Sequence, residues 1–90
     1  MKYHIDPNKI VWRNIDGDVV ILNLDSGVYY NLNKTGSLIW CLLDKQRSTE
    51  EIIERICERY RIAPEKASRD ILAVIEDLKK ESLIASDNKS

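Results

Sequence analysis

The fold is decided in one stretch of ten residues, Gly27-Val28-Tyr29-Tyr30-Asn31-Leu32-Asn33-Lys34-Thr35-Gly36. Before this stretch, β-branched and aromatic residues alternate with short turn motifs, which is typical of strands. After it, apolar residues recur at helical spacing. Strands followed by helices predict an α+β domain, with the changeover near Asn33.

Three strands are expected in the first half of the chain, at residues 10–15, 19–24 and 28–32. Asp16-Gly17-Asp18 separates the first two, because a glycine between aspartates supplies the positive φ of a tight turn. Asp25-Ser26-Gly27 fits a three-residue hairpin loop closed by a left-handed glycine. Short strands joined by tight hairpins predict a three-stranded antiparallel sheet.

The three-residue loop also predicts the register of the second hairpin. It places three apolar pairs on the face expected to form the core: Leu24 with Val28, Leu22 with Tyr30, and Val20 with Leu32. Asn23, Tyr29 and Asn31 are expected on the other face. A two-residue turn pairs Asn23 with Tyr30 and mixes polar with apolar side chains on both faces, so we reject that register.

Three helices are expected in the second half, at residues 34–44, 49–60 and 64–81. Asn33 or Thr35 is a candidate N-cap for the first helix. Ser48 and Glu51 have the spacing of a capping box before the second. Pro64 suits the first turn of the third, where its missing N–H donor is harmless.

The chain is expected to form a single domain, residues 1–90, with an ordered core at about 9–85 and flexible ends. Leu83-Ile84 is a candidate for a last short strand. Residues 85–90 are polar and are expected to fray.

Composition excludes several classes of function. The formal charge of −1 and the sequence pI near 5.8 give no general attraction to nucleic acid or anionic lipid. No apolar run is long enough for a membrane span or a signal peptide, so we expect a cytoplasmic protein. Cys41 and Cys57 are interpreted as small buried hydrophobes, although spacing alone leaves a disulfide between them open.

No set of residues for catalysis is evident, because a nucleophile needs a base to activate it and a group to orient that base. The only histidine, His4, lies in the N-terminal segment, far in sequence from both cysteines. His4 and Asp6 are too few ligands for a metal site, and the scattered glycines form no phosphate loop. We therefore expect no enzyme activity, no metal and no cofactor.

The free edge of the strand at 28–32 is the feature with functional content. It contains no proline, lysine or other charged residue, and such residues normally protect an edge against pairing with another chain. A peptide adding as a further strand would gain backbone hydrogen bonds there. The alternative is that Tyr29 and Tyr30 are ordinary sheet aromatics with no ligand.

The stretch at 27–36, together with Ile39-Trp40 and Leu42-Leu43-Asp44, resembles the PqqD-like family of RiPP recognition elements, which recognise ribosomally made precursor peptides. The capped helix start Thr49-Glu50-Glu51-Ile52, the closing Tyr60 and the pair Leu83-Ile84 match the same family. The resemblance covers about residues 9–85. One departure is Ala63 before Pro64, where the family more often has Asp or Ser as a cap.

The resemblance implies a winged helix-turn-helix that binds the leader segment of a precursor antiparallel to the third strand, against the third helix. On the strand, it implies contacts from Val28, Tyr29, Tyr30, Asn31 and Leu32. On the helix, it implies contacts from Ala67, Asp70, Ile71, Val74, Asp77 and Leu78. Small Ala67 is expected to leave room for an aromatic or proline side chain of the leader.

The length resembles that of the discrete recognition proteins of lasso-peptide pathways, whose implied partners are a leader peptidase and an ATP-dependent macrolactam synthetase. The alternative is a chaperone for a radical-SAM enzyme, as in pyrroloquinoline-quinone maturation. A DNA-binding regulator is the less favoured reading of a winged helix. Residues 64–81 carry four basic and five acidic side chains, a balance that does not neutralise phosphates.

Overall fold

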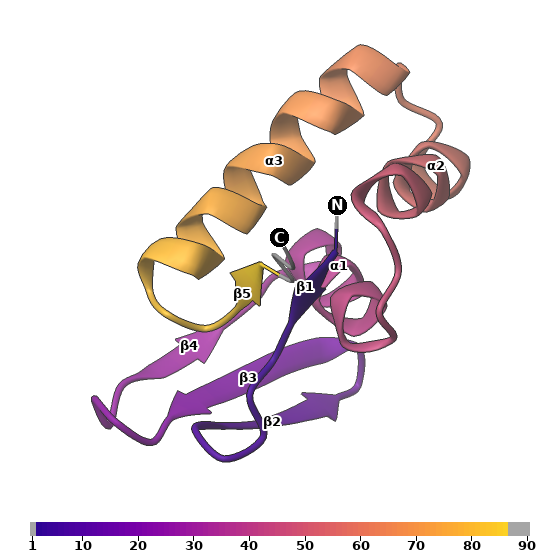
Figure 1. The fold of residues 1–90 in the computed structure, drawn as a ribbon. Helices are drawn as coiled ribbons and strands as arrows, with labels where there is room; N and C mark the ends of the chain where they lie inside the picture. The colour runs from indigo at the N-terminus through magenta and orange to yellow at the C-terminus, as the bar shows by residue number, and fades with distance from the viewer. Residues whose placement is uncertain (1, 87–90) are drawn as a thin grey trace.

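Three strands near the start of the chain form an antiparallel sheet that supports three helices (Figure 1). The computed structural model describes residues 2–86. The elements are β2 (Ile10–Ile15), β3 (Asp18–Asn23), β4 (Tyr29–Asn31), α1 (Lys34–Asp44), α2 (Thr49–Tyr60) and α3 (Pro64–Lys80). The predicted α+β fold, a winged helix-turn-helix with a three-stranded sheet followed by three helices, is confirmed. No described helix is both long and apolar enough to cross a membrane.

The helix boundaries follow from local capping. The Asn33 side chain accepts a hydrogen bond from the Gly36 N–H (2.8 Å) at the start of α1. Ser48 and Glu51 form the predicted capping box of α2, and the Ser48 N–H that donates to Glu51 lowers the pKa of that carboxyl group. Helix α3 begins at Pro64 as predicted, although Ala63 makes no side-chain cap.

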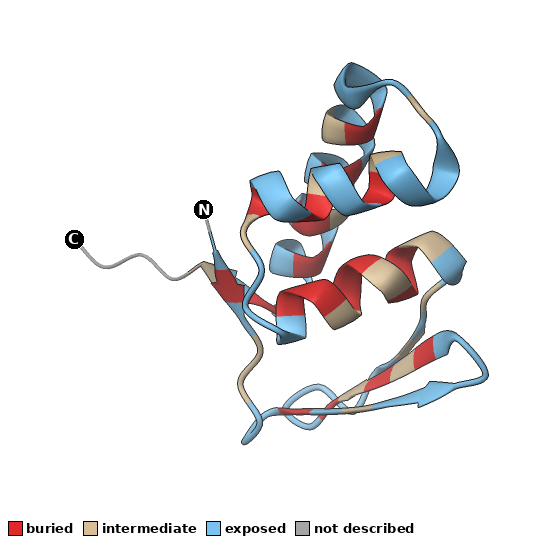
Figure 2. Cartoon of the chain, turned by 90° about the vertical axis from the view of Figure 1, so that its right-hand side faces the viewer, coloured by how far each residue is buried: buried red, intermediate tan, exposed pale blue. Residues whose placement is uncertain are grey.

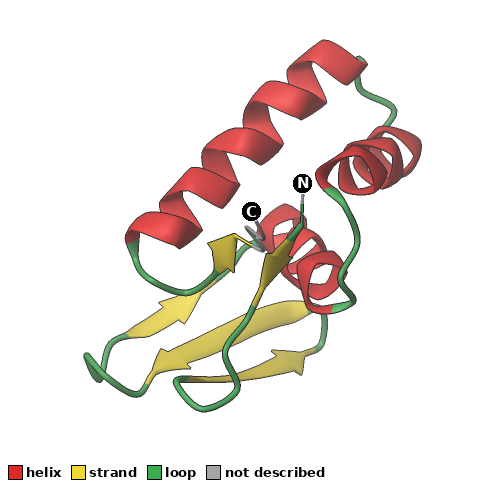
Figure 3. Ribbon diagram, in the orientation of Figure 1, coloured by secondary structure: helices red, strands yellow, loops and turns green. Residues whose placement is uncertain are grey.

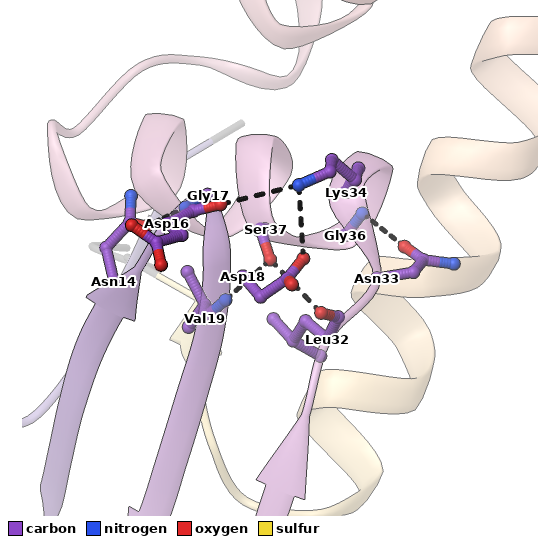
Figure 4. Close-up of polar contacts among 10 residues, drawn as sticks. All are labelled: Asn14, Asp16, Gly17, Asp18, Val19, Leu32, Asn33, Lys34, Gly36 and Ser37. Atoms are coloured by element: carbon purple, nitrogen blue, oxygen red, sulfur yellow. Dashed lines mark hydrogen bonds and ion pairs between the residues drawn. The ribbon is translucent and has the colours of Figure 1, made fainter.

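Ser37 joins α1 to the end of the sheet (Figure 4). Its hydroxyl oxygen accepts a hydrogen bond from the Val19 N–H (2.8 Å), and the same hydroxyl donates to the Leu32 carbonyl (3.3 Å). The hydroxyl therefore stands between the Val19 N–H and the Leu32 carbonyl, which would bond directly to each other if the ladder of β3 and β4 continued. This contact ends β4 and fixes the direction in which the chain enters α1.

The core lies between the helices and one face of the sheet (Figure 2). Trp40 of α1 is fully buried and meets Trp12 of β2 edge to face, with 6.0 Å between ring centroids. Helix α2 packs on both α1 and α3, and the two helices α2 and α3 contribute the buried side chains Ile52, Ile56, Ala67, Ile71, Ile75 and Leu78 to the core. Within residues 2–86, no helix covers the opposite face of the sheet (Figure 2).

The register predicted for the second hairpin is wrong by one residue. Tyr30 pairs with Ile21 and not with Leu22, and Tyr29 pairs with Leu22. The core face of β3 therefore carries Val19, Ile21 and Asn23, all buried, while four residues predicted for the core lie outside it. Val20 and Leu22 are only half-buried on the outer face, and Leu24 and Val28 are exposed at the hairpin.

Asn23 explains the shift. Its side-chain oxygen accepts hydrogen bonds from the N–H groups of Asp25 (2.9 Å) and Ser26 (3.2 Å). The Gly27 N–H donates to the Asn23 carbonyl (2.7 Å), with Gly27 at a φ of +73°. The loop therefore has four residues, 24–27, and is organised by a buried asparagine that the predicted three-residue loop places on the other face.

Replacing Asn23 by alanine should lower the free energy of unfolding by about 1–3 kcal/mol, because two loop N–H groups lose their acceptor. Urea denaturation measures this change. The exposed Asn31→Ala variant is the matched control and should change stability by less than about 0.5 kcal/mol. Equal stabilities of the two variants would contradict this role for Asn23.

The ends of the described chain pack together. Strand β1 (Tyr3–His4) pairs antiparallel with β5 (Ala85–Ser86), and Tyr3 is only 5% exposed. The packed domain therefore begins before residue 9, because the Tyr3 ring supplies core surface. The predicted last strand lies two residues later than Leu83-Ile84, which are themselves buried. Residues 87–90 of the predicted frayed tail lie outside the described residues.

Candidate peptide-binding site

Strand β4 is one of the two edge strands of its sheet, with β2 at the other edge (Figure 3). The Leu32 N–H donates to the Val19 carbonyl (2.9 Å), and the Asn23 N–H donates to the Val28 carbonyl (3.0 Å). In an antiparallel ladder, hydrogen-bonded residues alternate with residues whose backbone points away. Tyr29 and Asn31 therefore direct their N–H and C=O groups outward, and no described residue pairs with these groups.

The small β1–β5 sheet is separate from this edge. All five residues that the sequence selects on the strand lie here, but they are not equivalent. Tyr29 is 69% exposed, Val28 and Asn31 are also exposed, and Tyr30 and Leu32 are half-buried toward the helices. The backbone of Tyr29 and Asn31 is the part of the strand that can accept another chain.

Helix α3 runs past β4 (Figure 1). One column of its side chains, the open column, is exposed or half-buried and ends at Glu81, which accepts a hydrogen bond from Tyr30 of β4. The column is made of Lys66, Asp70, Val74, Asp77 and Glu81 at spacings of three or four residues. Of the helix residues selected from the sequence, Asp70 and Asp77 are exposed and Val74 is half-buried, so these three are accessible.

The other three selected helix residues lie beneath the column. Ala67 is 0% exposed, and Ile71 and Leu78 are buried with it in the core. Ala67 therefore leaves no room for a guest side chain, and a bulky residue there would overpack the core. The sequence prediction took residues from both columns because the two columns are adjacent on the helix.

At one end of the site, β4 and α3 are joined by a hydrogen bond. The Tyr30 hydroxyl donates to a carboxylate oxygen of Glu81 (2.8 Å), the C-cap of α3, and this bond raises the pKa of the Tyr30 hydroxyl. The Asn23 amide also reaches the Glu81 carbonyl (3.5 Å). Glu81 was not predicted as a site residue, because in the sequence it is one of several charged residues at the end of the helix.

At the other end, a cavity of about 250 Å³ opens between the three helices. Its lining is Thr35 and Ile39 of α1, Ile56 and Tyr60 of α2, Ile62 of the connection, and Lys66, Asp70, Ile71 and Val74 of α3. The only charges are Lys66 and Asp70, which pair with each other (3.2 Å) and are both exposed. The cavity suits one apolar side chain.

The α1 and α2 residues of this cavity were not predicted as site residues. The available signal in the sequence was Tyr60, an aromatic residue at the end of its helix. In the structure Tyr60 is 38% exposed. Thr35 follows β4 closely in sequence and lines the cavity, so the cavity lies where the strand edge ends. The site thus has a backbone edge, a helical wall and one apolar cavity.

Residues suited to catalysis or metal binding do not gather at this site. Cys41 and Cys57 are free and half-buried, and neither lines the edge or the cavity. Within residues 2–86, no group of three or more His, Cys, Asp or Glu side chains is placed to hold a metal ion. The chemistry available is recognition of an extended chain by its backbone and by an apolar side chain.

Comparison with known proteins agrees with this geometry. The family model described as "Coenzyme PQQ synthesis protein D (PqqD)" matches residues 18–84. No curated protein gives a significant match. Two solved structures are similar over nearly the whole chain. The first is TbiB1 in complex with the TbiA(beta) leader peptide, with 32% identity, a TM-score of 0.88, and coverage of 99% of this chain and 100% of that one.

The second is a lasso peptide synthetase B1 complexed with the leader peptide, with 27% identity and a TM-score of 0.86. The alignment covers 96% of this chain and 100% of that one. The family match spans well over half of the chain, and the fold agrees with both relatives along their full length. The chain therefore belongs to the PqqD-like family of RiPP recognition elements.

Proposed function

We propose that this chain binds the leader segment of a ribosomally made precursor peptide and presents the precursor to the enzymes that mature it. The observation that carries the proposal is the outward-facing backbone of Tyr29 and Asn31, on a strand that the Tyr30–Glu81 hydrogen bond joins to α3. A leader strand added here would satisfy backbone groups that the described chain leaves unpaired.

The antiparallel orientation that the family resemblance implies gives the captured chain a direction. Strand β4 runs from the hairpin toward α1, so a leader antiparallel to it enters near Thr35 and leaves near Glu81. The N-terminal part of the leader then lies at the apolar cavity, where one aliphatic, aromatic or proline side chain anchors it. The C-terminal part, which continues into the core peptide, passes the Tyr30–Glu81 hydrogen bond.

The role of the chain is capture and presentation, with no catalytic step of its own. Holding the leader raises the local concentration of the core peptide at a bound enzyme. Both solved relatives are complexes with a leader peptide, and one of them is a lasso peptide synthetase B1, which favours a leader peptidase and a macrolactam synthetase as partners. The description of the family model favours instead a radical-SAM maturase of the PqqD type as the second candidate.

Titration of the chain with fluorescent leader peptides from precursor genes beside its own should give saturable anisotropy curves with one site per chain. A scrambled leader of equal composition and a labelled DNA duplex at physiological salt are the controls, and neither should bind. Binding of the scrambled peptide with equal affinity would contradict recognition by this site. Addition of the chain to a peptidase or a radical-SAM enzyme then identifies which activity on the full precursor rises.

A further inference from the structure

Two carboxylates lie at the end of α3 where the helix itself disfavours them. Asp77 is in the last turn, and Glu81 is the C-cap four residues later. The partial negative charge at the C-terminus of a helix favours cations there, and like charges four residues apart repel each other. Residues placed against such local preferences are expected chiefly at functional positions.

Asp77 differs from the other acidic residues of α3 in having no local role. Glu65 lies in the first turn, where the helix dipole favours a carboxylate, and the two remaining acidic residues each pair with a lysine of the same helix. The side chain of Asp77 is exposed and forms no hydrogen bond or ion pair with another described residue, Lys80 included. Its negative charge is therefore available to a partner.

Both carboxylates belong to the open column, and Glu81 touches the edge strand. Its carboxylate accepts the hydrogen bond from the Tyr30 hydroxyl (2.8 Å). Asp77 lies one helical turn before Glu81 on the same column. A leader strand added to β4 would therefore pass both carboxylates on its way out of the site.

Charge is distributed unevenly along the site. Residues 28–32 of the edge strand carry no charge, and at the cavity end Lys66 and Asp70 neutralise each other as an ion pair (3.2 Å). At the other end Asp77 and Glu81 form no ion pair with a described residue. Uncompensated negative charge is thus concentrated where the leader leaves the site.

We infer that Asp77, supported by Glu81, selects leaders that carry a lysine or arginine in the part that continues toward the core peptide. The inference rests on the proposed function and names the class of leader that the site prefers. A cation there would neutralise charge that the helix end disfavours, and electrostatic complementarity of this kind supplies specificity and faster association.

The spacing of helix and strand gives the position of the basic residue in the leader. Measured along α3 from the part of the cavity wall midway between Asp70 and Val74, the two carboxylates lie about 7.5 and 13.5 Å farther on. An extended strand covers these distances in about two and four residues. Because alternate side chains of a strand share a face, the lysine or arginine is expected two or four positions after the anchoring side chain.

The test uses the fluorescent leader from the precursor gene beside this one. Alanine scanning of the leader locates its anchoring side chain, and lysine, glutamine or glutamate is then placed two or four positions later. Wild type, Asp77→Asn and Asp77→Lys are titrated with each peptide by anisotropy. Glu76→Gln is the matched control, because it removes a neighbouring exposed carboxylate that already pairs with Lys79.

Wild type and Glu76→Gln should bind the lysine peptide about threefold or more tightly than the glutamine peptide, and the glutamate peptide most weakly. Asp77→Asn should lose this preference, and Asp77→Lys should reverse it, so that glutamate in the leader restores affinity. Both Asp77 variants should be at least as stable as wild type in thermal unfolding, because each removes a carboxylate from the negative end of the helix.

Equal binding of the three peptides by wild type, or the same order of affinity in wild type and Asp77→Lys, would overturn the inference and leave the proposed function standing. Loss of stability in both Asp77 variants would overturn it too, because Asp77 would then have a structural role. Absence of binding by every peptide, the native leader included, would instead refute the proposed function and the inference with it.

Discussion

Replacing Asn31 by proline should weaken leader binding by roughly tenfold or more while the domain stays folded. Asn31 pairs with Val20 at a position where its N–H points away from β3, so the ladder loses no hydrogen bond. The added leader strand does lose a hydrogen bond, because proline has no N–H to donate to it, and the proline ring projects into the space that the leader occupies. An edge strand tolerates proline where the N–H faces outward.

Two comparison variants isolate the backbone. Asn31→Ala keeps the outward N–H and should bind the leader within about threefold of wild type. Tyr30→Pro removes an N–H that faces Ile21 of β3, so it should lower the thermal stability of the domain. Anisotropy titration and thermal unfolding measure the two properties. Full leader affinity in folded Asn31→Pro would place the leader away from the β4 edge.

The helices were predictable because their ends are set by neighbouring residues. The Asn33 cap, the capping box of Ser48 and Glu51, and Pro64 each act within one turn of the helix that they start. All the residues that form such a signal are therefore close together in the sequence. All three helices accordingly begin where predicted, and only the end of α3 differs, by one residue.

The strand register was not predictable in the same way. Residues 19–22 are apolar on both faces of β3, so the pattern gives little contrast between core and surface. The decision comes from Asn23, whose buried side chain holds the loop through Asp25 and Ser26. The predicted three-residue loop placed Asn23 on the outer face, whereas Asp25 and Ser26 satisfy the side-chain oxygen of Asn23 in its buried position.

Only part of the site was predictable, because some of its residues are brought together by tertiary packing. The open edge of β4 follows from strand order and from the absence of charge, both of which are visible in the sequence. The cavity beside Thr35 requires three helices to meet, so its residues from α1 and α2 have no local signature. The resemblance implied contacts from Ala67, Ile71 and Leu78 of α3, all of which are buried in the core. Of these three, Ile71 also lines the cavity.

Replacing Val74 by glutamate should reduce leader affinity by roughly tenfold to a hundredfold. Val74 is half-buried on α3 and lines the apolar cavity that we assign to the anchoring side chain of the leader. A carboxylate there must lose hydration when the leader enters, and it lies one helical turn from the carboxylate of Asp70. The same change leaves the β4 edge intact.

Two variants separate the charge at Val74 from its position. In Val74→Gln, glutamine has nearly the shape of glutamate without its charge. The difference in leader affinity between Val74→Gln and Val74→Glu therefore measures the electrostatic part of the loss. Ala73→Glu adds the same charge one residue earlier, at an exposed position that does not line the cavity, and should bind the leader like wild type. Thermal unfolding confirms that all three variants fold. If Val74→Glu and Ala73→Glu bind the leader equally well, the cavity is not the anchor, and the leader is held by the β4 edge and the rest of α3 alone.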